Sequence, residues 1–303
     1  MYTVPILFVI FRRKDAALQS FARIRDAKPA RLYIAGDGPR PGVDGEAEQV
    51  EQTRKAVMDA IDWPCEVKTL FRDCNIGCGQ GVYTAINWFF EHEERGIIIE
   101  DDCVLQPSFF PFAEELLERY KDDERIGMIA GTNPLGEVAV TESYLFSKYA
   151  ACWGWATWRR AWNKMDIGMS FLSSKKEDVI ANRGCGNERN RWLYQIGMIA
   201  KGRVSAWDWQ WYFSLAAQNQ LCIFPKANLV SNIGDDEMAT HTAFSSIRRD
   251  GKHIAFPLVH PEFVMPSVSF DKALHRDGNT TAAWLKRHLP YHLKQQIKKL
   301  THR

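Results

Sequence analysis

Gly96-Ile97-Ile98-Ile99-Glu100-Asp101-Asp102 is the stretch that decides the fold, because an apolar run ends abruptly in three acids. Branched residues without polar alternation favour a strand that is covered on both faces, as in a parallel sheet. The carboxylates at its end are hard oxygen ligands of the kind that Mg²⁺ and Mn²⁺ prefer. A solvated acidic turn is the other interpretation, and the adjoining buried strand favours a ligand site over it.

Strands and helices alternate through the first hundred residues. Apolar runs predict four strands, and periodic apolar positions predict the helices between them, at residues 6–11, 15–27, 31–38, 45–61, 66–70, 81–93 and 96–99. This order predicts an α/β fold with a mainly parallel central sheet and helices on both faces.

Polar side chains follow each of the predicted strands. They are Arg12-Arg13, Asp37, Arg72 and the acidic triplet. Ligands of parallel sheets bind beyond the carboxyl ends of the strands, so we expect these groups to meet at one edge. For the arginine pair a solvated strand end remains open, and for Asp37 a turn-forming Asp-Gly pair.

A glycine-rich loop, residues 72–81, precedes the third predicted helix. Glycines let backbone N–H groups approach a phosphate, and a helix N-terminus favours an anion. The loop lacks Gly-Lys-Ser/Thr, so it is not a nucleoside-triphosphate loop. Arg72 and Asn75 are the side chains that we expect to reach a ligand, although a tight turn with a helix cap explains each glycine equally well.

Tryptophan is concentrated in the second half, where seven of 11 Trp lie in segments 152–162 and 207–211. Aromatic faces stack well on sugar rings, so this half is expected to build an acceptor surface, although many of these tryptophans suit a core. Asp208 lies before a helical run, where the helix dipole keeps a carboxylate ionised and ready to accept a proton. An ordinary helix-capping aspartate is the alternative.

The opening stretch, together with Pro107, Phe109 and Phe110, resembles the metal-binding motif of GT-A fold glycosyltransferases. The nearest types are N-acetylglucosaminyltransferase I and the bacterial hemolytic protein HlpA-like nucleotide-diphospho-sugar transferases. The resemblance extends from residue 4 to about residue 242. Its best-matched segments are Asn75-Ile76-Gly77, Glu100-Asp101-Asp102, Trp153–Trp158, Asn232-Ile233-Gly234 and Thr240-His241-Thr242.

The resemblance implies roles for individual residues. It makes Asp102 the direct metal ligand, places Asp101 on the ribose, and has Glu100 support the donor from the side. It further implies that Arg13 contacts the nucleotide or its diphosphate, that Asp37 contacts uracil, and that Asp208 is the general base. The contacts of Arg72 and Asn75 with the donor are expected from the glycine-rich loop itself. His241 is a candidate second metal or diphosphate contact, with an ordinary loop histidine as the alternative. Arg12 departs from the family pattern.

The implied activity is metal-dependent, inverting sugar transfer from a nucleotide diphosphate, with a UDP-sugar as donor. The expected acceptor is a hydroxyl of a glycan or lipid-linked saccharide, the expected metal Mn²⁺ or Mg²⁺, and the expected setting bacterial polysaccharide synthesis. Two rival functions remain open, the first of which would use the same acidic triplet without needing Asp208. One is a metal-dependent nucleotidyltransferase or phosphohydrolase, and the other is a non-catalytic carbohydrate-binding protein.

Composition and segment patterns limit the remaining possibilities. The net charge of +2 argues against a nucleic-acid partner, and seven cysteines without paired zinc spacing suit free thiols in the cytoplasm. The apolar run at 4–11 is short and suits a buried strand better than a signal peptide.

The expected organisation is a GT-A domain over 1–265, divided into a nucleotide-sugar-binding half (1–130) and an acceptor-binding half (131–265). A basic helical extension over 266–303 follows. Segment 284–303 holds six Lys/Arg and no acid, which suits either peripheral contact with the inner face of a membrane or packing on the domain.

Overall fold

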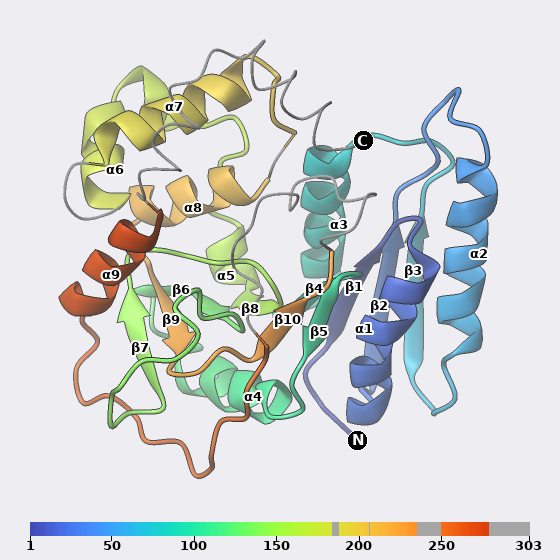
Figure 1. Cartoon of the computed structure of the whole chain (residues 1–303), viewed down its shortest axis with the longest axis horizontal. Coiled ribbons are helices and arrows are strands. Elements are labelled where there is room, and N and C mark those ends of the chain that lie inside the picture. Colours follow the sequence, from blue (N-terminus) through green and yellow to red (C-terminus); the bar gives the residue numbers. More distant parts are fainter. Residues whose placement is uncertain (184–187, 206, 235–249, 279–303) are drawn as a thin grey trace.

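A central sheet organises the computed structural model, which describes residues 1–183, 188–205, 207–234 and 250–278 (Figure 1). Its strand order in this part of the chain is β3-β2-β1-β4-β8-β6-β9-β7. The strands are β1 (Ile6–Ile10), β2 (Arg31–Gly36), β3 (Glu66–Phe71), β4 (Arg95–Glu100), β6 (Ile126–Ala130), β7 (Tyr144–Ser147), β8 (Trp155–Trp158) and β9 (Leu221–Pro225). A separate antiparallel pair joins β5 (Cys103–Leu105) to β10 (Val230–Asn232).

The two ends of this sheet differ in strand direction. Strands β3, β2, β1 and β4 are all parallel, as the alternation of strands and helices predicts. Beyond them β8 pairs antiparallel with both β4 and β6, β9 runs parallel to β6, and β7 runs antiparallel to β9. The predicted α/β class with a mainly parallel central sheet is therefore confirmed.

Helices cover both faces of the sheet, because both faces of its strands are apolar. On β1, Ile6, Phe8 and Ile10 belong to the cluster that contains the inner side chains of α1 (Lys14–Ala27) and α4 (Phe109–Arg119). Leu7 belongs to the opposite cluster. Successive side chains of a strand point to opposite faces, so a continuous apolar run needs two covering layers.

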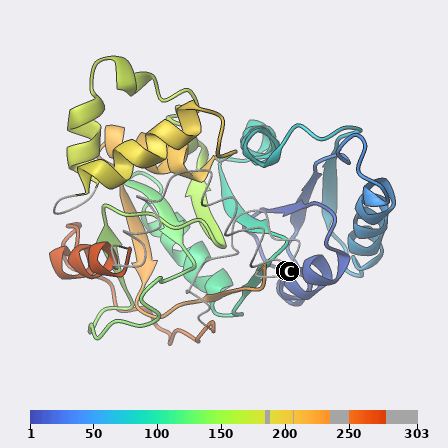
Figure 2. The ribbon, with the colours of Figure 1, turned by 45° about the horizontal axis from the view of Figure 1, so that its top comes forward.

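The second layer begins with α3 (Cys78–His92), which lies across the sheet from α1 and from α2 (Glu46–Asp59) (Figures 1 and 2). Further along the chain, α5 (Arg159–Trp162), η1 (Ser170–Ser173), α6 (Lys176–Arg183), α7 (Arg189–Ala200) and α8 (Asp208–Ala217) follow. Figure 2 shows α6, α7 and α8 gathered over the part of the sheet that contains β6 and β9, away from α1 and α2.

Two helices start earlier than the periodicity predicts. Helix α3 begins at Cys78 and not near Gly81, directly after Gly77, whose positive φ of 87° suits glycine at this turn. Helix α8 begins at Asp208 and not after Trp211, so Asp208 is its first residue. The glycine-rich loop is therefore shorter than expected, and the predicted position of Asp208 at a helix N-terminus is confirmed.

The described part of the C-terminal region is the helix α9 (Val268–Gly278). Phe270 and Leu274 are buried, and the Phe270 ring lies 5.1 Å from that of Phe224 on β9. The start of the predicted extension over 266–303 is therefore packed on the domain. Segment 284–303 lies outside the described residues. No helix in the described ranges is long and apolar enough to cross a membrane.

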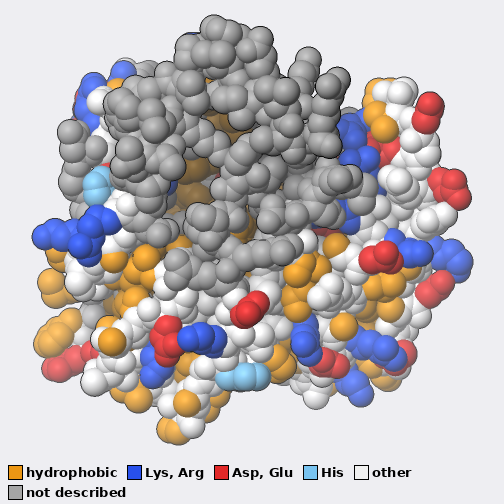
Figure 3. Space-filling view, viewed as in Figure 1, with side chains coloured by type: hydrophobic (Ala, Val, Ile, Leu, Met, Phe, Trp, Pro, Cys, Tyr) orange, Lys and Arg blue, Asp and Glu red, His pale blue; other side chains and the backbone are white. Residues whose placement is uncertain are grey.

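The surface carries charge of both signs. On the face shown in Figure 3, acidic and basic side chains of the described residues lie interspersed among apolar ones. Exposed ion pairs occur on the surface of the described residues, such as Lys55 with Asp59 at 2.8 Å and Lys164 with Glu124 at 2.6 Å.

Candidate active site

One cavity of about 590 Å³ lies at the carboxyl ends of the parallel strands. The side chains predicted for the site converge on it from four strand ends and from the start of α8. Those that line it are Arg13, Asp37, Arg72, Asn75, Glu100, Asp101, Asp102 and Asp208. His241 lies outside the described residues. The sheet edge therefore gathers these groups from segments up to 195 positions apart in the sequence, Arg13 and Asp208 being the most distant.

Arg13 forms the electrostatic centre of the acidic end of this cavity. Its Nη2 donates to Asp101 Oδ1 at 2.6 Å and to Asp102 Oδ2 at 3.0 Å. Asp101 Oδ2 also accepts the backbone N–H of Phe11 at 3.3 Å. Burial lowers the pKa of Arg13, but the two carboxylates outweigh this effect and the net shift is upward. Arg13 therefore carries a permanent positive charge at the end of β1.

Asp102 is held from several sides. Its Oδ1 accepts from the Asn232 amide at 3.2 Å, and its backbone carbonyl accepts from the N–H of Ile233 at 2.8 Å. Gly234 approaches so closely that a Cβ atom there would lie 2.2 Å from Asp102 Oδ2. The segment after β10 thus fits around this carboxylate only because residue 234 has no side chain.

Glu100 differs from its two neighbours. Within the described residues its carboxylate has no hydrogen-bond or ion-pair partner, although Asp101, Asp102 and Asp208 are near enough to act on it electrostatically. Burial, followed by these acids, raises the pKa of Glu100 well above its usual range. Burial likewise raises the pKa of Asp101 to about 6, against the effect of Arg13. This end of the cavity therefore concentrates negative charge.

The acidic end of the cavity suits a divalent cation that is coordinated partly by the protein and partly by a bound phosphate. In the described ranges no group of three His, Cys, Asp or Glu side chains is arranged to hold a metal ion. Asp101 and Asp102 offer two hard oxygen donors side by side. Mg²⁺ and similar ions are commonly held by one or two carboxylates, with phosphates and water completing the shell. The residues present therefore fit a phosphate-bound divalent ion better than an all-protein metal site.

Asp37 ties the loops after β2 and β3 together. Its carboxylate accepts the backbone N–H groups of Gly38, Ile76 and Gly77, each at 3.1 Å. Asn75 donates from Nδ2 to Gly38 O at 2.9 Å, which adds a second tie. These bonds give Asp37 and Asn75 a structural part in the cavity wall. Contacts of either side chain with a base or donor stay predictions.

A buried salt-bridge group at the neighbouring rim was not predicted. Glu46, fully buried in the first turn of α2, accepts the fork of Arg40 at 3.0 and 2.5 Å and Arg12 Nη1 at 2.9 Å. Both arginines line the cavity. The pKa of Glu46 is lowered, first by its hydrogen bond to Arg40. The only sequence signal was an acid at a predicted helix start, which is common.

Arg72 completes the cationic side. It lines the cavity after β3, and its Nη2 donates to Thr84 Oγ1 on α3 at 2.7 Å. The cavity thus has arginines at the ends of β1, β2 and β3 and carboxylates at the end of β4. A bound molecule with a negative phosphate and a nearby cation matches this division of charge.

Asp208 enters the cavity from the opposite side. It is half-buried as the first residue of α8, close enough to Glu100 to affect its pKa. Trp153 and Trp209, also half-buried, line the same cavity. The cavity thus holds one carboxylate and two indoles from the second half of the chain, and the role of Asp208 as a base stays a prediction.

Most of the tryptophans in the two rich segments belong to the core instead of an open acceptor surface. Trp155 and Trp211 are fully buried, Trp207 stacks on Trp155 with ring centres 5.6 Å apart, and Trp162 lies 5.0 Å from Trp211. Strand β8 lies inside the sheet, so its indoles have covering layers on both faces. The core interpretation applies to these residues.

The second half also supplies lining residues that sequence reasoning missed. They are Cys152, Gln195, Val204, Ser205 and Asn232. Ser205 Oγ accepts the N–H of Gly79, in the first turn of α3, at 3.1 Å. This bond joins the two sides of the cavity. A single serine in a loop carries no sequence signal for such a contact.

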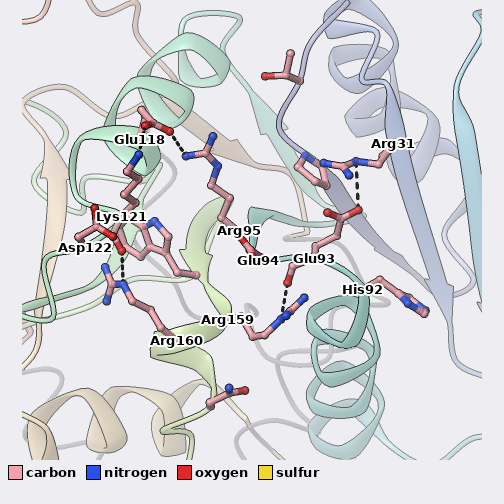
Figure 4. Close-up of a pocket in the computed structure, with 14 residues that line it drawn as sticks. Arg31, His92, Glu93, Glu94, Arg95, Glu118, Lys121, Asp122, Arg159 and Arg160 are labelled. Atoms are coloured by element: carbon pink, nitrogen blue, oxygen red, sulfur yellow. Dashed lines mark hydrogen bonds and ion pairs between the residues drawn. The ribbon is translucent and has the colours of Figure 1, made fainter.

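A second cavity, of about 890 Å³, lies at the amino ends of the parallel strands (Figure 4). It holds many charged side chains, but they pair with one another. Arg31 contacts Glu93 at 3.3 Å, while Arg95 and Lys121 both donate to Glu118 at 2.6 Å. Charge here is largely balanced within the protein, so this cavity is the weaker candidate for a site of chemistry.

In comparisons of sequence, no family model and no curated protein matches the chain. Solved structures show distant likeness. The mannosyltransferase PcManGT from Pyrobaculum calidifontis, in complex with GDP-Man and Mn²⁺, aligns with a TM-score of 0.36 and 11% identity over 71% of this chain and 73% of its own.

Two further structures align at a similar level. HddC from Yersinia pseudotuberculosis aligns with a TM-score of 0.32 and 8% identity, over 56% of this chain and 86% of its own. A cytidylyltransferase from Leptospira borgpetersenii aligns with a TM-score of 0.33 and 12% identity, over 59% of this chain and 69% of its own. These scores are too low to transfer a family, an activity or a ligand to this chain.

Proposed function

We propose that the protein transfers a sugar from a nucleoside-diphosphate donor, with UDP-sugar as the expected donor, to a hydroxyl group of a glycan or lipid-linked acceptor. The observation that carries the proposal is the single cavity that joins the ends of β1–β4 to Asp208 on α8. Arginines on one side and acids on the other suit a charged donor, and Asp208 faces it from the second half.

In this mechanism the arginines after β1–β3 bind and orient the donor. Asp102, with Asp101 beside it, would hold Mn²⁺ or Mg²⁺, which supplies positive charge to the leaving diphosphate. Asp208 removes the proton from the acceptor hydroxyl, which then attacks the anomeric carbon from the side opposite the diphosphate. The bond to the diphosphate breaks as the new glycosidic bond forms, so the anomeric centre is inverted.

The central test measures nucleoside diphosphate released from UDP-, GDP-, CDP- and ADP-sugars, with Mn²⁺, with Mg²⁺ and with chelator. Wild type is expected to release diphosphate from at least one donor in the presence of metal. Asp102→Asn is expected to lose this activity, whereas Asp59→Asn, on the exposed face of α2, is expected to keep it. Absence of release from every donor, with or without saccharide acceptors, would contradict the proposal.

The same assay separates the rival activities by their products. A nucleotidyltransferase would release pyrophosphate from a nucleoside triphosphate and a sugar phosphate. A phosphohydrolase would release inorganic phosphate without an acceptor. A non-catalytic carbohydrate-binding protein would bind saccharide in calorimetry and release none of these products.

A further inference from the structure

The feature that goes furthest beyond the proposed function is the position of the Arg13 guanidinium. A single nitrogen, Nη2, donates to both Asp101 and Asp102. A positive charge therefore already occupies the carboxylate at which a divalent cation is proposed to bind. Two cations cannot share the same lone pairs of one carboxylate, and their mutual repulsion opposes simultaneous binding.

The other contacts of Asp102 leave little free space around its carboxylate. Oδ1 accepts from Asn232, and Oδ2 lies against both Arg13 and the backbone of Gly234. Only 15% of the side chain is exposed. A cation that approaches Asp102 therefore meets Arg13, a neighbour of like charge, at the same carboxylate.

We infer that Arg13 is a counterion of Asp102 that couples the binding of the nucleoside diphosphate to the binding of the divalent cation. Its guanidinium stays bound to Asp102 until a diphosphate binds the guanidinium in place of Asp102. Nucleoside diphosphate and divalent cation then bind with positive cooperativity. This inference rests on the proposed function, because it takes Asp102 as the metal ligand. In the proposed function Arg13 only binds the donor, whereas here it also controls access of the cation to Asp102.

The geometry favours release of Asp102 rather than of Asp101. The Arg13 bond to Asp101 is the shorter, at 2.6 Å against 3.0 Å. In the described part of the chain only Nη2 of the Arg13 guanidinium makes hydrogen bonds, and the other guanidinium N–H groups suit phosphate oxygens. Arg13 can therefore keep Asp101 as its anchor while turning toward a diphosphate. By linkage, each ligand then raises the affinity for the other by the same factor.

The first experiment measures Mn²⁺ binding to the nucleotide-free protein by electron paramagnetic resonance. Arg13→Gln is expected to bind Mn²⁺ about tenfold more tightly than wild type, within the usual range of coupling between sites. Arg12→Gln is the matched control, because it removes the same charge from the same cavity but pairs with Glu46 and not with the triplet. Its Mn²⁺ affinity is expected to stay within about twofold of wild type.

A second variant covers the case in which Arg13→Gln alone fails to fold. Arg13→Gln combined with Asp101→Asn removes one charge of each sign and so leaves the net charge unchanged. It is expected to bind Mn²⁺ about tenfold more tightly than Asp101→Asn alone, because both proteins lack the Asp101 carboxylate and only the single variant keeps the Arg13 cation on Asp102. Adding Asp102→Asn is expected to abolish this gain.

A third measurement tests the coupling itself. UDP is expected to raise the Mn²⁺ affinity of wild type about tenfold more than that of Arg13→Gln. The complex between UDP and Mn²⁺ in solution is common to all variants and cancels in this ratio. Equal affinities for wild type and Arg13→Gln, or equal gains for Arg12→Gln and Arg13→Gln, would overturn the counterion role and leave the proposed function standing. No Mn²⁺ binding by any variant, even with UDP, would overturn the metal assignment and the inference together.

Discussion

The two edges of the central sheet both gather charged side chains, but they balance the charge differently. At the amino ends of the strands, Glu118 accepts Arg95 and Lys121, and Glu93 contacts Arg31 (Figure 4). At the carboxyl ends, the three successive acids that end β4 lie near Asp208, the first residue of helix α8. Glu100 has no partner in the described structure. Charge that the protein leaves unbalanced is the better guide to a site, because a bound ligand can stabilise it.

The largest expected effect comes from Asp208→Asn at the carboxyl edge. Loss of the general base should lower kcat by about 10²–10⁴-fold, while nucleotide affinity stays near that of wild type. The check is steady-state kinetics over a range of donor concentrations, with circular dichroism to confirm the fold. An unchanged kcat would show that Asp208 is an ordinary helix-capping residue.

The next effect concerns the buried Glu46, which holds Arg12 and Arg40 at the same edge. Glu46→Gln leaves two arginines without their shared anion and should lower the free energy of unfolding by about 3 kcal/mol. Glu48→Gln, exposed in the same turn of α2, is the control and should change it by no more than about 0.5 kcal/mol. Denaturant titrations measure the free energy of unfolding of both variants. Equally small changes in the two would mean that the salt bridges of Glu46 contribute little to stability.

A third prediction uses the raised pKa of Asp101, about 6 in the folded protein. The ordinary pKa of an unfolded aspartate is near 4, so the folded state binds this proton more tightly. The contribution of Asp101 to the free energy of unfolding should therefore fall as pH rises from about 4 to 6, by roughly 2 kcal/mol.

Asp101→Asn should remove this fall, and Asp59→Asn should keep it. Denaturant titrations at several pH values measure the difference. Asp101 is one of the acids that raise the pKa of Glu100, so the difference between the variants reports the titration of both acids. An equal pH dependence of stability in wild type and in Asp101→Asn would contradict the prediction.

The smallest effect is expected at the amino edge. Glu118 is 55% exposed, and exposed ion pairs contribute little to stability. Glu118→Gln should leave sugar transfer unchanged and keep the midpoint of thermal unfolding within about 2 °C of wild type. A large loss of activity would show that the cavity in Figure 4 has a function after all.

The sequence was most informative where local pattern alone decides the outcome. The apolar runs at β1–β4 specify parallel strands, and parallel strands bring Arg13, Arg72 and the acidic triplet to one edge. These side chains could be assigned to a common site because strand direction determines their placement.

Contacts that depend on packing between distant segments could not be predicted in this way. Glu46 is recognisable only once α2 lies beside the end of β1, and Ser205 only once its loop reaches the start of α3. Trp155 and Trp211 suited a sugar-binding surface as well as a core. The insertion of β8 into the sheet decides between them, and no periodicity indicates that insertion.

The position of β8 between β4 and β6 has a consequence for synthesis on the ribosome. Strands β1 to β4 are complete once residue 100 has emerged, and they can pair in parallel with one another. The outer edge of β4 then has no neighbour until residues 155–158 are available. An apolar strand with unpaired backbone groups is prone to pair with another chain. The nascent protein therefore exposes this edge to pairing with other chains while residues 101–154 are being made.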